Sequence, residues 1–227
     1  MTLTGIRACV FDAYGTLFDV HAAAARLKDE IGPKSDQLSA IWRTKQLEYT
    51  WLRSLIPAYK PFWEVTQDGL DFAMEECGLS ERGDLRQKLL DLYFKLDSYP
   101  EVPGMLAALK AGGLGTGILS NGSMDMLDGA VDSAGIRDRL DAVLSVESVG
   151  IFKPDPRVYQ LVMDHFGLDD RASVAFMSSN AWDAAAAAHF GFQVVWVNRF
   201  GKPWERLPGE PKAVLTDLSG LPQLSGV

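Results

Sequence analysis

The chain has 227 residues, of which 47% are hydrophobic and 23% are charged, a composition typical of a folded globular protein rather than a disordered one. The formal net charge of -8 argues against a nucleic-acid-binding surface, and we see no clustered basic stripe. No apolar run is long enough to span a membrane and no signal peptide is present, so we expect a cytoplasmic protein. Two cysteines, Cys9 and Cys77, fit a reducing compartment.

Short apolar runs alternate with helical patterns along most of the chain. The strand-like runs lie at residues 6–11, 116–119, 142–146, 174–177 and 194–197, with a weaker one at 213–216. Helical patterns separate most of these runs, at residues 103–111, 124–134, 156–166 and 182–190. Strands that alternate with helices are typical of the α/β class, and we expect a doubly wound parallel sheet.

The stretch between residues 20 and 96 lacks any comparable strand pattern. Helical patterns occupy it instead, at residues 22–30, 36–55, 66–77 and 85–96, and prolines and glycines mark the breaks between them. We therefore expect a helical domain of residues 19–97, inserted into an α/β core domain made of residues 1–18 and 98–227.

The first predicted strand ends at Asp12, and Gly15 then breaks the apolar pattern. Open α/β sheets bind ligands beyond the carboxyl ends of their strands, so the Asp12 carboxylate is a candidate catalytic group. The alternative is that Asp12 merely ends the strand. Tyr14, two residues further on, cannot act as a second carboxylic acid.

Other predicted strands also end in polar residues. Ser120 and Asn121 follow the second strand, where they suit either anion binding or an ordinary helix cap. Lys153 precedes a helix start; a lone lysine there is ordinarily a surface residue, but its place after the Asp12 and Ser120 strands favours a functional one. A polar string at residues 178–183 follows the fourth strand and contains Ser178, Asn180 and Asp183.

In this chain order, Asp12, Ser120, Lys153 and Asp183 resemble the motifs of the haloacid dehalogenase superfamily. The string at residues 178–183 resembles that of its L-2-haloacid dehalogenases (type II) in particular. The resemblance implies a Rossmann-like core with a helical cap, and Asp12 as the nucleophile. The phosphatases of the superfamily usually carry a second aspartate where this chain has Tyr14, and a magnesium-binding acid where it has Ser179.

These two differences favour dehalogenation without a metal or cofactor. A departing alkoxide is a strong base and needs a proton from an acid, whereas a departing halide does not. Asp12 with one more distant aspartate is a poor ligand set for magnesium, which prefers several oxygen ligands in octahedral geometry.

The segment at residues 41–53 resembles the cap helix of these dehalogenases in residue order. The resemblance implies that Arg43 lies near the substrate carboxylate and the departing halide. It also implies a substrate pocket walled by Tyr14, Leu47, Phe62 and Trp182, although core packing is the alternative explanation for apolar residues at helical spacing. The long helix carries more large side chains than one pocket needs (Trp42, Tyr49, Trp51 and Leu55), so we expect a homodimer, which the family commonly forms.

We therefore expect the hydrolysis of (S)-2-haloacids to (R)-2-hydroxyacids. Asp12 attacks C2 of a 2-haloalkanoate, the halide leaves, and water hydrolyses the aspartyl ester. The resemblance assigns the supporting roles in three groups. Thr16, Ser120 and Lys153 position Asp12; Asn180, Lys153 and Asp183 orient or activate the water; Arg43 and Asn121 hold the halide, with Ser178 and Tyr159 as further polar residues in or beside the site.

Two other functions remain open on the sequence. A phosphatase or phosphonatase of the same superfamily would require magnesium and an acid at position 14, against which Tyr14 and Ser179 argue. A non-catalytic binding module on the same fold would be expected to lose the nucleophile or its lysine, yet Asp12 and Lys153 are both retained.

Overall fold

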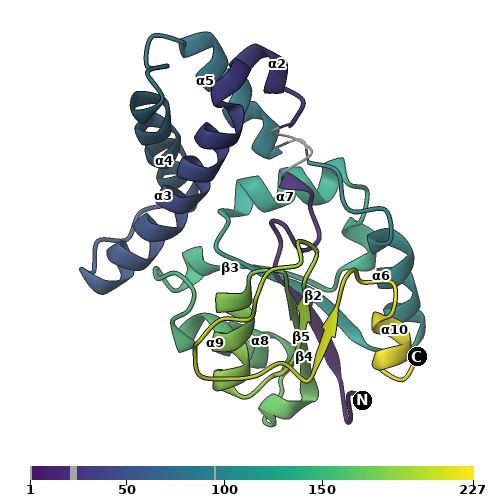
Figure 1. Ribbon diagram of the computed structural model, residues 1–227. Coiled ribbons are helices and arrows are strands. Elements are labelled where there is room, and N and C mark those ends of the chain that lie inside the picture. The colour runs from purple at the N-terminus through teal and green to yellow at the C-terminus, as the bar shows by residue number, and fades with distance from the viewer. Residues whose placement is uncertain (1, 21–24, 95) are drawn as a thin grey trace.

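The computed structural model describes residues 2–20, 25–94 and 96–227. One sheet of six parallel strands runs through it in the order β3-β2-β1-β4-β5-β6 (Figure 1). This confirms the predicted doubly wound α/β fold. The strands are β1 (Ala8–Phe11), β2 (Gly115–Ser120), β3 (Ala142–Ser145), β4 (Val174–Ser178), β5 (Gln193–Val197) and β6 (Ala213–Leu215).

The central strand β1 sets the position of the candidate site. All four of its residues are buried, as expected for a parallel strand covered on both faces. Its last residue, Phe11, pairs with Ile118 of β2 on one side and with Met177 of β4 on the other. The chain builds outward from β1 in both directions, so the strand order reverses between β1 and β4. Ligands bind open α/β sheets at the carboxyl edge of such a reversal.

Helices cover both faces of the sheet. In Figure 1, α8 and α9 lie on one side and α6 and α10 on the other. The amphipathic helix α8 begins where Asp155 accepts a hydrogen bond from the backbone N–H of Arg157, and ends at Gly167, whose φ of 60° suits glycine. The core helices are α6 (Val102–Ala111), α7 (Met124–Ser133), α8 (Pro156–Phe166), α9 (Ala181–Phe190) and the unpredicted short α10 (Leu221–Leu224).

The inserted segment forms a separate helical group above the carboxyl edge of the sheet (Figure 1). It has a hydrophobic cluster of its own, which includes Leu38, Trp42, Leu70 and Leu85. The helices α3 and α4 form its central pair, and the group does not add a strand to the sheet within the described residues. Its helices are α2 (Lys28–Ile31), α3 (Ser35–Leu55), α4 (Phe62–Glu76) and α5 (Gly83–Asp91).

Several predicted boundaries in this segment were wrong. Helix α4 begins at Phe62 rather than at residue 66, because Pro61 precedes it in an extended conformation that suits a helix start. The predicted helix at 85–96 ends at Asp91, and a 3-10 turn at Leu92–Phe94 follows it. The predicted helix at 22–30 lies partly outside the described residues; α2 begins only at Lys28.

No helix within the described ranges is both long and apolar enough to cross a membrane.

Leu70 tests whether the inserted helices depend on their own hydrophobic cluster. Its side chain is 0% exposed within that cluster. We expect Leu70→Ala to lower the free energy of unfolding by about 2–5 kcal/mol, because it removes buried methyl groups and leaves a cavity. Urea denaturation followed by circular dichroism measures this. Leu207→Ala is the matched control, since the side chain of Leu207 is 49% exposed; equal losses in both variants would contradict the prediction.

Candidate active site

Asp12 lies directly after β1, and its carboxylate accepts three hydrogen bonds. Lys153 Nζ donates to Oδ1 at 3.1 Å, while Thr16 Oγ1 and Asn180 Nδ2 donate to Oδ2 at 3.1 and 2.9 Å. The backbone N–H of Asp12 donates to the carbonyl of Met177 in β4, which continues the strand pairing by one residue. The carboxylate is therefore held in a fixed orientation at the carboxyl edge of the sheet.

The turn after Asp12 passes close to the loop after β4. Gly15 has a φ of +83°, and a Cβ at this position would lie 3.2 Å from Ser179 Oγ. Thr16 Oγ1 accepts a hydrogen bond from the backbone N–H of Ser179 at 2.8 Å. The positive φ favours a glycine here, and a side chain would also crowd the Ser179 hydroxyl.

Lys153 forms ion pairs with two carboxylates. Its Nζ lies 3.1 Å from Asp12 Oδ1 and 2.8 Å from Asp183 Oδ2, and its side chain is 1% exposed. Burial lowers the pKa of the Lys153 ammonium, but the two carboxylates outweigh burial and raise it above the usual lysine range. The ammonium therefore stays charged at neutral pH and occupies the space between the two carboxylates.

Asp183 in the first turn of α9 is fully buried, and Tyr159 of α8 donates its hydroxyl proton to Asp183 Oδ1 at 2.8 Å. Burial raises the pKa of Asp183, and the nearby charge of Lys153 opposes that shift. Burial also raises the pKa of Tyr159 well above its usual value, so its phenol remains a neutral donor. Asp183 thus has a donor on each oxygen.

Arg43 brings a positive charge from the inserted helices to the core. It lies on α3, and its Nη2 donates to Asn180 Oδ1 at 3.1 Å. Asn180 occupies the N-cap position of α9, and the Ser178 hydroxyl accepts a hydrogen bond from its backbone N–H at 3.2 Å. Asn180 therefore contacts both the guanidinium of Arg43 and the carboxylate of Asp12.

Aromatic side chains lie beside this polar centre. The Tyr14 ring stacks on Phe62 with centroids 6.4 Å apart and packs against Tyr93 at 5.9 Å. Burial raises the pKa of Tyr14 far above its usual value, and its hydroxyl has no hydrogen-bond partner among the described residues. A Cβ at Gly122 would lie 2.8 Å from the Tyr14 ring, so this ring fills the space beside the glycine. Tyr14 is a neutral, buried phenol.

The side chains of Ser120 and Asn121 both accept hydrogen bonds from backbone N–H groups. Ser120 is buried, but its hydroxyl accepts a hydrogen bond from the backbone N–H of Gly122 at 3.0 Å and forms none with Asp12. The Ser120 hydroxyl therefore orders the turn that follows β2. Asn121 Oδ1 accepts a hydrogen bond from the backbone N–H of Lys153 at 2.9 Å, which positions the loop that carries the lysine.

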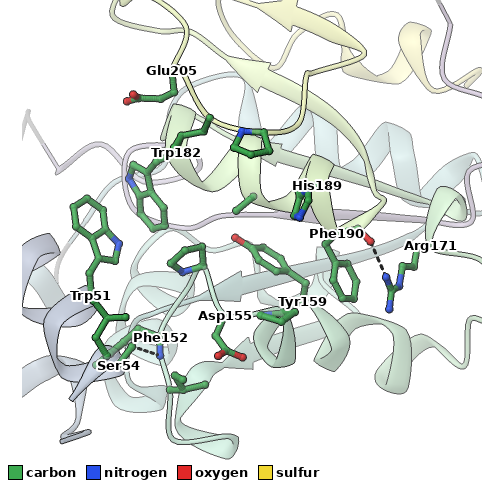
Figure 2. A pocket seen from close by; sticks show the side chains of 17 residues that line it. Trp51, Ser54, Phe152, Asp155, Tyr159, Arg171, Trp182, His189, Phe190 and Glu205 are labelled. Carbon is green, nitrogen blue, oxygen red and sulfur yellow. Dashed lines mark hydrogen bonds between the residues drawn. The ribbon is translucent and has the colours of Figure 1, made fainter. Parts of the chain in front are cut away.

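A cavity of about 900 Å³ lies next to this centre (Figure 2). Trp182 and Tyr159 line it, and Trp182 meets Trp51 of α3 edge to face at 5.4 Å. Neither Asp12 nor Lys153 lines this cavity. Leu47 is half-buried on α3, one turn after Arg43. Of the predicted pocket residues, Tyr14 and Phe62 therefore pack together, whereas Trp182 and Tyr159 also face a separate hollow.

Three residues that the sequence patterns did not indicate are connected to Arg43: Gln46 bonds to it directly, and Thr66 and Tyr93 bond to Gln46. Gln46 Oε1 accepts a hydrogen bond from Arg43 Nη1 at 2.8 Å, and Gln46 Nε2 donates to Thr66 Oγ1 at 2.8 Å. The sequence contained one signal for this group: Gln46 is a polar residue at a position that the helical period places on the buried face of α3.

A family model described as haloacid dehalogenase-like hydrolase matches residues 6–191. The (S)-2-haloacid dehalogenase 1 of Pseudomonas sp. strain CBS-3 is 50% identical over 220 residues, which cover 96% of each chain. The (S)-2-haloacid dehalogenase of Pseudomonas sp. strain YL is 44% identical over 219 residues, which cover 96% of this chain and 94% of that protein.

A solved structure of the L-2-haloacid dehalogenase from Xanthobacter autotrophicus, with chloropropionic acid covalently bound, is also similar. It is 36% identical, with a TM-score of 0.89 and coverage of 96% of this chain and 98% of that chain. The family model spans most of this sequence, and the relatives align with this chain over nearly their whole lengths. This chain therefore belongs to the haloacid dehalogenase-like hydrolases and, within them, to the L-2-haloacid dehalogenase family.

Proposed function

We propose that this protein hydrolyses (S)-2-haloacids to (R)-2-hydroxyacids through an ester formed on Asp12. The carboxylate of Asp12, held by Thr16, Asn180 and the charged ammonium of Lys153, carries this proposal. The position two residues after the nucleophile holds a neutral tyrosine instead of a carboxylic acid, which suits a leaving group that needs no proton. The names of the relatives, and the covalently bound chloropropionic acid in one of them, support the same reaction.

In the first step, the Asp12 carboxylate attacks C2 of the haloacid from the side opposite the halogen. The new C–O bond forms as the carbon–halogen bond breaks, and the halide leaves with the bonding electron pair. Carbon inverts in this step, so an (S)-haloacid gives an (R)-hydroxyacid. Arg43, whose guanidinium reaches the site from α3, is the group that binds the substrate carboxylate and, together with Asn121 next to the Lys153 loop, the departing halide.

In the second step, water attacks the carbonyl carbon of the Asp12 ester, and the bond from this carbon to the substrate oxygen breaks. The departing oxygen takes up the proton that Asp183 accepted from the water, which releases the hydroxyacid and restores both carboxylates. Ester formation neutralises Asp12, so Asp183 alone then balances the charge of Lys153. Burial raises the pKa of Asp183, which makes its carboxylate a better proton acceptor for the attacking water. Asn180 and Lys153 orient that water, and Ser178 holds the backbone of Asn180. Residues 1–18 and 98–227 form the core domain in this scheme, and residues 19–97 form the cap.

We also propose that the protein acts as a cytoplasmic homodimer. Within the described residues, the exposed large apolar side chains include three in or just after the last turn of α3: Leu52, Leu55 and Ile56, at 52, 78 and 67% exposure. Trp42, Tyr49 and Trp51 do not add to that surface, because Trp42 is buried and the other two pack within the chain. Both cysteines are buried free thiols, which suits a reducing compartment.

Replacement of the nucleophile tests the reaction. With EDTA present, we expect the wild-type protein to release halide from L-2-chloropropionate and not from the D enantiomer. Asp12→Asn should lower kcat at least about a thousandfold, because the attacking group is lost. In a single turnover in heavy-oxygen water, mass spectrometry should find the label in the Asp12 carboxylate, since water attacks the ester carbonyl. No halide release from either enantiomer, together with magnesium-dependent phosphate release from p-nitrophenyl phosphate, would support a phosphatase instead.

The charge state of Lys153 predicts the alkaline side of the pH profile. Because the pKa of Lys153 is raised, its ammonium loses its proton only above the usual lysine value of about 10.4. We expect kcat/KM for L-2-chloropropionate to stay within about twofold from about pH 8 to about pH 10. Initial rates at constant ionic strength measure this. A fall with a midpoint below about pH 9.5 would contradict a charged Lys153 in the reacting enzyme.

Charged residues at the end of α3 test the homodimer. We expect sedimentation equilibrium to give twice the mass of one chain for the wild-type protein. Leu55→Glu combined with Ile56→Glu should give the mass of one chain, because burying two carboxylates in an apolar interface is unfavourable. Val214→Glu on the edge strand β6 is the control, since Val214 is also more than half exposed. A monomeric wild-type protein would refute the proposal.

A further inference from the structure

Gln46 is a fully buried amide on the face of α3 that packs against α4. The buried residues Leu38, Trp42, Gln46 and Thr50 recur every four positions along this face. A buried amide destabilises a protein unless its polar atoms are hydrogen-bonded. Both ends of the Gln46 amide have such partners, because the oxygen accepts from Arg43 Nη1 and the nitrogen donates to Thr66 Oγ1, each at 2.8 Å.

The contacts fix which end of the amide faces which partner. Thr66 donates its only hydroxyl proton to the carbonyl of Phe62 at 2.8 Å, so its oxygen can only accept from Gln46. The guanidinium of Arg43 has only donors, so the Gln46 oxygen must face it. Rotation of the amide by half a turn would lose both hydrogen bonds.

The other end of the Arg43 guanidinium also bonds to an amide whose orientation is fixed. Arg43 Nη2 donates to Asn180 Oδ1 at 3.1 Å, and Asn180 Nδ2 donates to Asp12 Oδ2 at 2.9 Å. A continuous series of hydrogen bonds therefore runs from Thr66 in α4, through Gln46 and Arg43 in α3, to the nucleophile in the core. Every amide in the series has a single orientation that satisfies both neighbours.

The two helices approach each other closely at this point. A Cβ at Gly69 of α4 would lie 3.2 Å from the backbone nitrogen of Gln46 and 3.4 Å from Trp42 Cδ1. Trp42 donates its indole N–H to the carbonyl of Thr66 at 2.8 Å. Backbone contact and hydrogen bonds thus fix the position of Thr66 relative to Gln46.

We infer that Gln46, oriented by Thr66, is a positioning residue that holds the Arg43 guanidinium in the direction needed for substrate binding and for its contact with Asn180. A free arginine side chain samples many rotamers, and a single hydrogen bond to Asn180 leaves its other nitrogens without a fixed direction. The buried Gln46 oxygen supplies the second point of attachment. This inference rests on the proposed function, because it assigns Arg43 to the substrate.

Gln46→Leu and Thr66→Val test the inference with L-2-chloropropionate. We expect Gln46→Leu to lower kcat/KM about thirtyfold, because Arg43 loses a charge-assisted hydrogen bond. Thr66→Val should lower it about fivefold, because Gln46 Nε2 then loses its short hydrogen bond to Thr66 and keeps only the longer one, at 3.5 Å, to the Tyr93 hydroxyl. Thr66→Ser should stay within about twofold of the wild type. The thermal unfolding midpoint of each variant shows whether it is folded, and the Thr66 pair decides the test if Gln46→Leu fails to fold.

Thr50→Val is the matched control. Thr50 is also buried on α3, and its hydroxyl donates to the carbonyl of Leu47 without touching Arg43. We expect this variant to keep kcat/KM within about twofold of the wild type. A loss in Thr50→Val equal to that in Thr66→Val would show a general effect of helix packing and would overturn the inference.

A double-mutant cycle separates positioning from packing. Binding of the product D-lactate, followed by tryptophan fluorescence, is measured in Gln46→Leu, Arg43→Ala and the double variant. If Gln46 acts through Arg43, Gln46→Leu weakens binding about tenfold in the wild-type background and within about twofold in Arg43→Ala. Equal weakening in both backgrounds would overturn the inference. Failure of the wild-type protein to release halide would instead refute the proposed function.

Discussion

The ammonium of Lys153 between the carboxylates of Asp12 and Asp183 is the interaction on which the centre depends. Two carboxylates close to one buried position repel each other, and the ammonium between them offsets that repulsion. Lys153 is itself buried, so it keeps its charge only because the two carboxylates lie beside it. Loss of Lys153 would leave two buried carboxylates without a cation, and Asn121 fixes the loop that carries this lysine.

The position of this triad follows from the sheet. Asp12 directly follows β1, and Asp183 lies in the first turn of α9, which follows the neighbouring strand β4 at the reversal of strand order. Tyr159 reaches Asp183 from α8, on the face of the sheet that α9 also covers. The fold thereby brings the proposed nucleophile, a cation and the proposed proton acceptor together on rigid elements, and the inserted helices supply the charge that we propose binds the substrate.

That charge is Arg43, and its contact with Asn180 joins the two parts of the molecule. Asn180 accepts from Arg43 through its oxygen and donates to Asp12 through its nitrogen. A displacement of α3 would therefore also move a side chain that holds the Asp12 carboxylate. Gln46 is a polar residue in a buried position behind Arg43. Because a guanidinium has only donors, the Gln46 oxygen serves as an acceptor for Nη1, the nitrogen that does not bond to Asn180. Tyr14 contributes by its shape and neutrality, since it fills the space beside Gly122 as a phenol that keeps its proton.

The sequence by itself determined the strands, most of the helices and the polar groups at the strand ends, because hydrophobic periodicity and chain breaks are local signals. The resemblance of its motifs to those of the haloacid dehalogenase superfamily also implied that Asp12, Lys153 and Asp183 serve one site, and Lys153 lies within hydrogen-bond distance of both carboxylates. Only the tertiary structure decided that the Ser120 hydroxyl bonds to the backbone of Gly122 and not to Asp12, because that choice depends on a rotamer and its neighbours. It alone also decided that Thr66 lies beside Gln46, because residues 20 positions apart on two helices meet only when the helices pack.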